Sequence, residues 1–534
     1  MTSTPHTPRP GSRLRSPRGA ALRACAVFSV AALALASCGG SSEPAESGDE
    51  VPEAAVAEDQ DLVVALTTDV DNLLPWTATQ FQATNVLRNI YGTLTELDHD
   101  LEVVPGLAED WEISDDGLTA TFHLREGVTF FDGTELTAED VVASFEAIQD
   151  PDTAAAAATN LASVESIEAT DDHTVTMNLS TPDTALFSKV ALGNAAILPA
   201  DADLEELETE PNGTGPFSLS ERVANDSLTL EANPDYWGEG PQLDTVEFRV
   251  IPDESAIVSA LQAGSVHMAT FDDPLVADTI GAGVEILETP QLTYHVLQLR
   301  ADEEPLDDVN VRRALACTID RQEVLDSAAM GAGEVVGPFT SPAHLSDPGS
   351  RPCPEPDLDR AEEYLAEAGY EDGLELSAIV MSDGYSTAVA EGETIQAQLA
   401  QVGIDLSLEV LESGSYVDRW VDADFTLAVA RNAGNPDPDV TYGRYFRSDG
   451  NFNEVAGYRS DALDELFEQG LAETDEEARA EIYEEISDYL EEQAVWIWLF
   501  AGYEYTALTE GVSGYTAMAN SSMQGLREAV LVDH

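Results

Sequence analysis

Between residues 292 and 431, segments with strand patterns alternate with segments that have helical spacing. Leu374–Met381 and Ile404–Leu411 are rich in aliphatic residues, and Ala388–Gln401 between them has the spacing of a helix. A strand–helix–strand order favours parallel neighbours, because the helix carries the chain back to the starting edge of the sheet. The sequence therefore predicts an α/β unit with a largely parallel sheet. Its other predicted elements are the strands Leu292–Leu299 and Phe425–Arg431 and the helices within Asp307–Met330 and at Asp359–Ala368.

Outside this region the patterns are more mixed. Asp61–Leu66 has the pattern of a buried strand, and Gln82–Leu97 has helical spacing. Period-two segments surround a capping-box sequence, Thr137-Ala-Glu-Asp140, which predicts a helix start within an α+β unit over roughly 100–209. The strand Val495–Leu499 carries Trp496 and Trp498, two residues apart, so both should point into the core from one face.

The charge of the chain excludes several classes of protein. The 534 residues include 23 Lys+Arg and 102 Asp+Glu, a formal net charge of −79, while 43% of residues are hydrophobic. A core can therefore form beneath an acidic surface, and phosphate backbones are repelled, so we expect no nucleic-acid partner. Lys189, the only lysine, is followed by Val190, which excludes a Walker-type ATPase. Adaptation to salt and a generally acidic proteome are equally good explanations of the charge.

The N-terminus has the features of an export signal. Residues 1–37 hold five arginines and no acid, and an apolar run leads to Leu35-Ala36-Ser37-Cys38. This order resembles a bacterial lipoprotein signal peptide (1–37), in which Cys38 takes the lipid; an ordinary signal peptide is the alternative. Residues 38–60 are then a flexible acidic tether. We expect a protein on the outer face of the cytoplasmic membrane, held there through its lipid anchor alone.

Two cysteines remain after the proposed anchor. Cys317 lies in a helical pattern and Cys353 in a proline-rich segment. Outside the cytoplasm such a pair is a candidate for a disulfide. Two separate buried thiols are an equally good alternative.

Motifs spread over most of the chain resemble one family. They include Leu107-Ala-Glu-Asp-Trp111, Thr121-Phe-His-Leu-Arg-Glu-Gly127, Gly213-Thr-Gly-Pro-Phe217, Asn233-Pro-Asp-Tyr-Trp237 and Val311-Arg-Arg-Ala-Leu315. Together they resemble the solute-binding proteins of family 5, which serve ABC importers for peptides, nickel and related solutes. The resemblance runs from about residue 61 to residue 500.

This resemblance implies an α/β, two-lobed periplasmic-binding-protein-like fold (type II, long form) with an extra α+β domain and a hinge. Lobe I would be discontinuous (61–99, 210–292 and 502–534), the extra domain would span 100–209, and lobe II would span 293–501. The sequence contains no zinc-protease motif, no nucleophile elbow and no complete calcium loop, so we expect no cofactor, no metal and no enzyme activity. The partners would be a peptide or other small solute and the permease and ATPase subunits of an importer, with the receptor itself a monomer.

The resemblance also indicates where a solute would bind. In peptide-binding relatives an aspartate in a loop of the second lobe holds the ligand's ammonium group, and the matching position here is Gly434. Asp437 could take over this role, or the ligand lacks that ammonium; Asp437 and Asp439 could also simply cap turns beside Pro436 and Pro438. The full set of predicted ligand-binding residues is Trp76, Gln80, Phe81, Trp420, Arg431, Asn432, Gly434, Asn435 and Asp437. For the aromatic residues, core packing is the simpler alternative.

Three functions follow. The first is a receptor for peptides, and the second is a receptor for another solute, such as a nickel chelate, an oligosaccharide or an opine. The third is a signalling or adhesion lipoprotein that keeps the fold without transport. His267 and His295 are isolated, and a structural role is the simpler prediction for each of them.

Overall fold

The structure is a computed structural model that describes residues 55–70, 72–78, 80–338, 350–382 and 385–533. The predicted signal peptide, Cys38 and the tether as far as residue 54 lie outside these ranges. Within the described part of the chain, no helix combines the length and the apolar character needed to cross a bilayer.

A large mixed sheet organises residues 55–533. Its order is β15-β14-β16-β12-β17-β11-β1-β10-β9-β8, with β13 paired to β17. The strands are β15 (Ile404–Leu411), β14 (Leu374–Met381), β16 (Leu427–Asn432), β12 (Val284–Leu299), β17 (Ile497–Thr509), β11 (Met268–Phe271), β1 (Asp61–Leu66), β10 (Thr245–Val250), β9 (Ser227–Ala232), β8 (Phe217–Val223) and β13 (Gly333–Val335).

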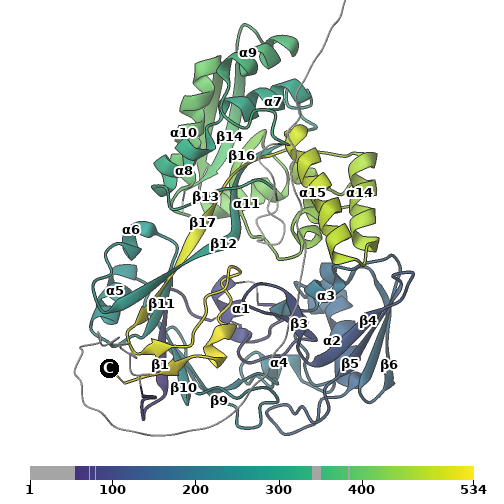
Figure 1. Ribbon diagram of the computed structural model, residues 1–534, viewed down its shortest axis with the longest axis vertical. Coiled ribbons are helices and arrows are strands. Elements are labelled where there is room, and N and C mark those ends of the chain that lie inside the picture. Colours follow the sequence, from purple (N-terminus) through teal and green to yellow (C-terminus); the bar gives the residue numbers. More distant parts are fainter. Residues whose placement is uncertain (1–54, 71, 79, 339–349, 383–384, 534) are drawn as a thin grey trace, which may run out of the picture. The chain divides into compact units, whose positions relative to one another are not determined.

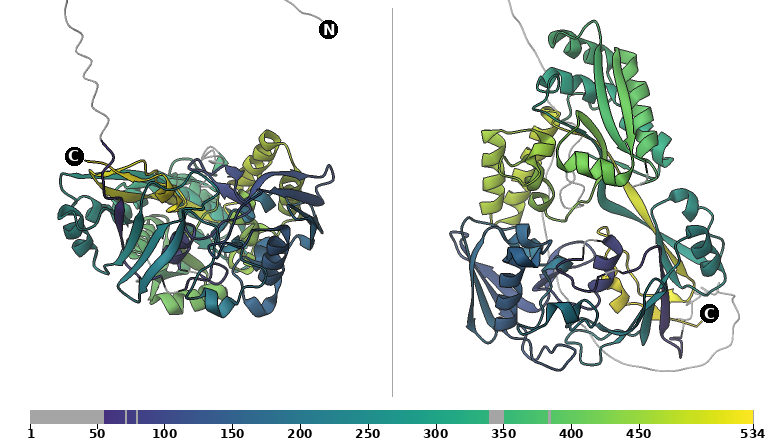
Figure 2. Two further views of the ribbon diagram at one scale, coloured as in Figure 1. Left: turned by 90° about the horizontal axis from the view of Figure 1, so that it is seen from below. Right: turned by 180° about the vertical axis from the view of Figure 1, so that it is seen from behind.

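Two long strands connect the two lobes. β12 and β17 are antiparallel, and they run side by side from the lower to the upper lobe in Figure 1 and again in the view from behind in Figure 2. Their register shifts between Pro290 and Tyr294, so regular pairing is interrupted between the lobes. The family resemblance implies a hinge near Leu292–Leu299 and Leu499–Tyr505, close to this interruption; hinge motion and the domain boundaries stay predictions.

Lobe II has a core of its own, formed by buried residues from Tyr294 to Ala501. In this core β14 pairs in parallel with both β15 and β16, but β16 is antiparallel to β12, so the expectation of a largely parallel sheet is correct only for the outer strands. Trp496 and Trp498 are fully buried in this core, as predicted. The principal helices of the lobe are α7 (Val309–Thr318), α8 (Arg321–Ala329), α9 (Leu358–Glu367), α10 (Ala388–Leu399), α11 (Ser413–Val421), α14 (Asp461–Ala472) and α15 (Glu476–Glu492).

Aspartates begin many of these helices. The side chains of Asp308, Asp320 and Asp357 accept backbone N–H groups at the starts of α7, α8 and α9, which the acidic composition makes easy to supply. Cys317 at the end of α7 forms a disulfide with Cys353, which fixes the segment before α9 to α7.

The α+β unit does not have a core of its own. Its sheet, in the order β4-β5-β7-β6, is antiparallel and packs with α2 (Ala138–Gln149), whose predicted capping box is present. Phe122 and Phe145 of this unit belong to the same hydrophobic cluster as Leu62 and Phe248 of lobe I. The strands are β4 (Ala108–Ile113), β5 (Thr119–Leu124), β7 (Thr174–Leu179) and β6 (Val164–Asp171), and the short helix α3 (Leu186–Lys189) follows.

The predicted helix over Gln82–Leu97 is wrong beyond its first turns. Helix α1 covers Phe81–Leu87, and Thr95–Leu97 form β2, paired with β3 (Val103–Pro105). The carbonyls of Asn89 and Ile90 accept the backbone N–H groups of Phe217 and Gly215, so they cannot continue the helix. A tertiary contact therefore overrides the local spacing.

Candidate functional site

The carboxyl ends of strands in the two lobes face one another. In lobe I, β11 runs toward Phe271, which pairs with Tyr505 of β17. In lobe II, β16 runs toward Asn432, which pairs with Tyr294 of β12. Because β12 and β17 are shared, these registers place both ends beside the interruption between the lobes. Ligands of α/β proteins bind beyond the carboxyl ends of strands, so this is the expected place for a solute.

A cavity lies at this position, and we call it the hinge cavity. Its volume is about 100 Å³, and Asp272 and Gln291 line it from lobe I while Tyr385 and Arg431 line it from lobe II. The Arg431 Nη1 lies 3.3 Å from Asp272 Oδ2, an ion pair between the two lobes. The remaining lining residues are Pro274, His295, Ala329, Ala332, Ser386, Thr387, Phe500, Gly502 and Tyr503.

His295, which lines the hinge cavity, is paired with a buried glutamate, Glu391. Glu391 of α10 is fully buried, and its Oε1 lies 2.8 Å from Nδ1 of His295. The Thr387 hydroxyl donates to the same oxygen. The imidazole stacks on Phe500, with ring centroids 4.2 Å apart and an angle of 13°. His295 is therefore held in one orientation from two directions.

The loop after β16 leads from the hinge cavity to a second cavity, which we call the loop cavity. This cavity of about 690 Å³ lies between the α+β unit and lobe II. Lys189 and Asn194 line it from the first, and Asn435, Asp439 and Arg447 line it from the second. Residues 431–439 thus run from the lining of the hinge cavity to the lining of the loop cavity.

Several ion pairs lie at the loop cavity or beside it. Asp183 binds Lys189 at 2.8 Å, Asp437 binds Arg479 at 2.8 Å, and Asp439 lies 3.9 Å from Arg447. Burial raises the pKa of Asp439 to about 6; Lys189 opposes this shift, whereas Asp437 adds to it. Burial lowers the pKa of Lys189, but Asp183 and Asp439 outweigh it, so the pKa is raised overall.

Both carboxylate oxygens of Asp437 have partners within the protein. Its Oδ2 pairs with Arg479, and its Oδ1 accepts the backbone N–H of Asp439. The turn-capping interpretation describes the contact with Asp439, and the ion pair with Arg479 of α15 adds a tertiary contact. With Gly434 in the usual acceptor position, neither residue offers a free carboxylate to a ligand's ammonium.

The other predicted residues divide between core and cavity. Trp76 is buried, and its indole N–H donates to the carbonyl of Ala196. Trp420 is half-buried, and its indole N–H donates to Gln298 at 2.6 Å. Asn432 is buried and donates to the Tyr294 hydroxyl. Arg431 lines the hinge cavity and Asn435 the loop cavity. Gly434 lies between these two, Gln80 is exposed just before α1, and Phe81 is the first residue of α1.

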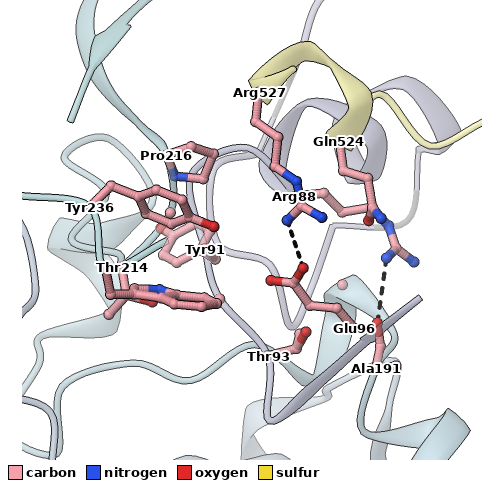
Figure 3. A pocket seen from close by; sticks show the side chains of 14 residues that line it. Arg88, Tyr91, Thr93, Glu96, Ala191, Thr214, Pro216, Tyr236, Gln524 and Arg527 are labelled. Atoms are coloured by element: carbon pink, nitrogen blue, oxygen red, sulfur yellow. Dashed lines mark hydrogen bonds and ion pairs between the residues drawn. The ribbon is translucent and has the colours of Figure 1, made fainter. Parts of the chain in front are cut away.

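A third cavity, between lobe I and the α+β unit, is too small for a solute. It has a volume of about 20 Å³, enough for one water molecule. Figure 3 shows Arg88 beside it, bonded to the Ala191 carbonyl, and the ion pair of Arg527 with Glu96 at 2.7 Å. This ion pair holds the C-terminal segment against lobe I.

Several of these residues could not be recognised in the sequence. Asp272 meets Arg431 across 159 positions, and Tyr385 carries no local motif. His295 could have been recognised as a residue with a buried polar partner, because a lone histidine in an apolar strand needs one. That partner is Glu391, 96 positions away. His267 has the structural role predicted for it, accepting the backbone N–H of Val63.

The site offers charged and hydrogen-bonding groups between two lobes. Among the residues that the structure describes, no cluster of three or more His, Cys, Asp or Glu side chains is arranged to hold a metal ion. The groups present suit reversible binding of a polar solute by convergence of the two walls.

Comparisons with known proteins agree with this architecture. A sequence model for "Bacterial extracellular solute-binding proteins, family 5 Middle" matches residues 102–454. The chain is 28% identical to the dipeptide-binding protein of Escherichia coli K12 (78% of this chain, 84% of the relative) and 28% identical to the oligopeptide-binding protein AppA of Bacillus subtilis (93% and 96%). Among solved structures it is similar to the binding protein AgaA of A. tumefaciens R10 in complex with agropinic acid, at 27% identity and a TM-score of 0.75, covering 89% of this chain and 99% of the other.

Proposed function

Because the chain belongs to the bacterial extracellular solute-binding proteins of family 5, we propose that it is the solute receptor of an ABC importer for short peptides. The solute binds beyond the facing carboxyl ends of β11 and β16, the lobes close on it, and the permease receives it.

The observation that carries this proposal is the meeting of the two lobes at the hinge cavity. Arg431 of lobe II and Asp272 of lobe I are in contact there, so a solute placed between them touches both lobes at once. A ligand that binds both walls better together than apart shifts the protein toward the closed state. The names of relatives support the peptide class, since they include dipeptide-, oligopeptide- and glutathione-binding proteins.

The receptor acts at the membrane surface as a monomer anchored through lipid on Cys38, with a permease and an ATPase as partners. The sequence around Cys38 supports this anchor. Replacement of Cys38 by alanine should release the protein from the membrane fraction into the medium, and a Cys38→Ala protein that stays with the membrane would contradict the anchor.

A second candidate is a receptor for a solute without a free ammonium group. Gly434 and the occupied carboxylate of Asp437 favour it, because the loop 431–439 then lacks the acceptor that peptide receptors use. A heme-binding protein of Haemophilus influenzae, 28% identical over 80% of this chain, shows that such relatives bind non-peptide solutes as well.

Mass spectrometry of the solute released on denaturing the purified protein separates the candidates. A ladder of short peptides supports the peptide receptor, and one non-peptide species supports the second candidate. Uptake of the released compound should be lost when the gene is deleted. Unchanged uptake would contradict transport and favour a signalling or adhesion role.

A further inference from the structure

The guanidinium of Arg431 makes few hydrogen bonds to the rest of the protein. It has five N–H donors, yet among the described residues its side chain makes one hydrogen bond, to Asp272 at 3.3 Å. Asp272 is 57% exposed in its side chain, so it holds this position loosely. The ring of Tyr385 lies 5.4 Å from the guanidinium carbon and supports it from one face. Several donors of Arg431 are therefore available in the hinge cavity.

Tyr385 brings a second donor to the same cavity. Its hydroxyl is buried and has no hydrogen-bond partner among the described residues. Burial raises the pKa of Tyr385 well above its usual value, so the group stays an O–H donor. A buried hydroxyl without a partner costs free energy unless a ligand or water completes it.

His295 completes this wall. Nδ1 of His295 lies 2.8 Å from Oε1 of Glu391, so this ring nitrogen already has a partner in the protein. The ring nitrogen left for a ligand is then Nε2. The stacked Phe500 and the edge of Tyr385, at 4.2 and 5.3 Å between ring centroids, hold the ring in place.

The two walls of the hinge cavity therefore differ in charge. Lobe II contributes a guanidinium, a hydroxyl and an imidazole, whereas lobe I contributes the carboxylate of Asp272. Donors gathered in a chain with 102 acidic residues need an explanation, because most of its surface repels anions. The donors of lobe II already bind one carboxylate, that of Asp272, through Arg431. A carboxylate of a solute has the same chemistry.

We propose that the hinge cavity binds a carboxylate group of the transported solute, with Arg431 and Tyr385 as direct donors and His295 beside them. The solute's carboxylate replaces that of Asp272, which contacts Arg431 in this structure. A planar carboxylate can accept two parallel N–H bonds from the guanidinium, whereas Asp272 accepts one. This proposal rests on the proposed function and specifies the chemistry of the solute.

The test compares acids with their amides. Binding of trialanine, trialanine amide, glutarate and glutaramide to the purified protein is measured by isothermal titration calorimetry. The wild type should bind each acid at least about tenfold more tightly than its amide, Arg431→Gln should remove this preference, and Tyr385→Phe should weaken it. Asp272→Asn should tighten binding of the acids, since the competing carboxylate is gone. Arg249→Gln is the matched control, because Arg249 pairs with Glu247 on β10 and lines none of the three cavities.

A variant of His295 needs its own control, since Glu391 would be left buried and unpaired. The double variant His295→Gln, Glu391→Gln keeps a hydrogen bond at this position and should lower affinity for the acids while its melting temperature stays close to that of the wild type. Equal affinity of acids and amides, no binding of either acid at millimolar concentration, or an unchanged preference in Arg431→Gln would overturn the proposal.

Failure of the proposed function is seen separately. Release of a solute that has no carboxylate, and whose uptake depends on the gene, would overturn the carboxylate site and leave the transport receptor intact. Uptake that is unchanged by deletion would remove the transport function, whatever the calorimetry shows.

Discussion

Asp437 and Arg479 form an ion pair 2.8 Å long, and the carboxylate is almost fully buried. The pair connects the loop after β16 to the start of α15, and Asp439 and Lys189 lie close by. The aspartate that the sequence offered for solute recognition thus serves the structure of the loop.

Asp437→Asn should destabilise the protein and leave solute selectivity unchanged. Breaking one side of a buried ion pair costs about 3–5 kcal/mol, because the remaining charge loses its partner. Urea unfolding gives the loss of stability, and calorimetry gives the ratio of affinities for trialanine and N-acetyl-trialanine. The double variant Asp437→Asn, Arg479→Gln should recover part of the stability. A stable single variant that loses its preference for the free amino group would restore Asp437 to the site.

The burial of Lys189, the single lysine of the chain, can be tested by chemical modification. Lys189 is mostly buried and paired with Asp183, so an amine-reactive ester should leave its side chain unmodified in the native protein. After denaturation the same reagent should modify Lys189 fully, as read by mass spectrometry of the peptide that contains it. Rapid modification in native buffer would contradict the packing of the α+β unit against the loop cavity.

The disulfide should contribute measurably to stability. Cys317 and Cys353 are 36 positions apart, and closing a loop of this length stabilises a protein by about 3–4 kcal/mol in the chain-entropy account. The double variant Cys317→Ser, Cys353→Ser should lower the melting temperature, and a reducing agent should lower that of the wild type by a similar amount. A melting temperature insensitive to both would show that the bridge carries no stability.

Glu504 should make stability depend on pH. Burial raises the pKa of this carboxyl from 4.5 to about 7; hydrogen bonds from Ser521 and Gln291 act against burial, and Asp272 adds to it. Between these values the folded chain binds more protons than the unfolded chain, so this group's contribution to stability falls as the pH rises from about 4.5 to 7.

Glu504→Gln removes this effect. The variant should unfold with a higher free energy than the wild type at pH 8, by on the order of 2–3 kcal/mol, and with a similar one near pH 4.5. Urea unfolding at the two pH values checks it, with the exposed Glu510→Gln as the control. Equal stability of Glu504→Gln and the wild type at pH 8 would contradict the raised pKa.

Local patterns predicted those elements whose structure depends on local burial. The limits of β1, β14 and β15 agree with the predicted strands, because uninterrupted or alternating aliphatic residues mark a strand buried on one or both faces. The helix over Gln82–Leu97 failed because the carbonyls of Asn89 and Ile90 bond to residues more than a hundred positions away. Strand β17 extends ten residues beyond the predicted end at Leu499, since it is paired with β12 and β11 in lobe I.

Only part of the candidate site could be predicted from the sequence. The family resemblance indicated the loop that holds Arg431 and Asn435, and these two residues line the hinge cavity and the loop cavity. Asp272, Tyr385 and Glu391 reach the hinge cavity or its wall through the topology of the sheet, which no local spacing encodes. A role of Asp437 in binding stays a prediction, because a carboxylate in this loop looks the same in sequence whether it faces a ligand or Arg479, its partner in the structure.

Hydrogen exchange with and without the released solute tests the central claim most directly. The claim is that a solute binds beyond the facing carboxyl ends of β11 and β16. It predicts slower exchange in the residues that follow β11, around Asp272, and in the loop after β16, with little change in α9 and in the segment around Arg88. Protection confined to these last two regions, with none at Asp272 or in residues 431–435, would contradict it.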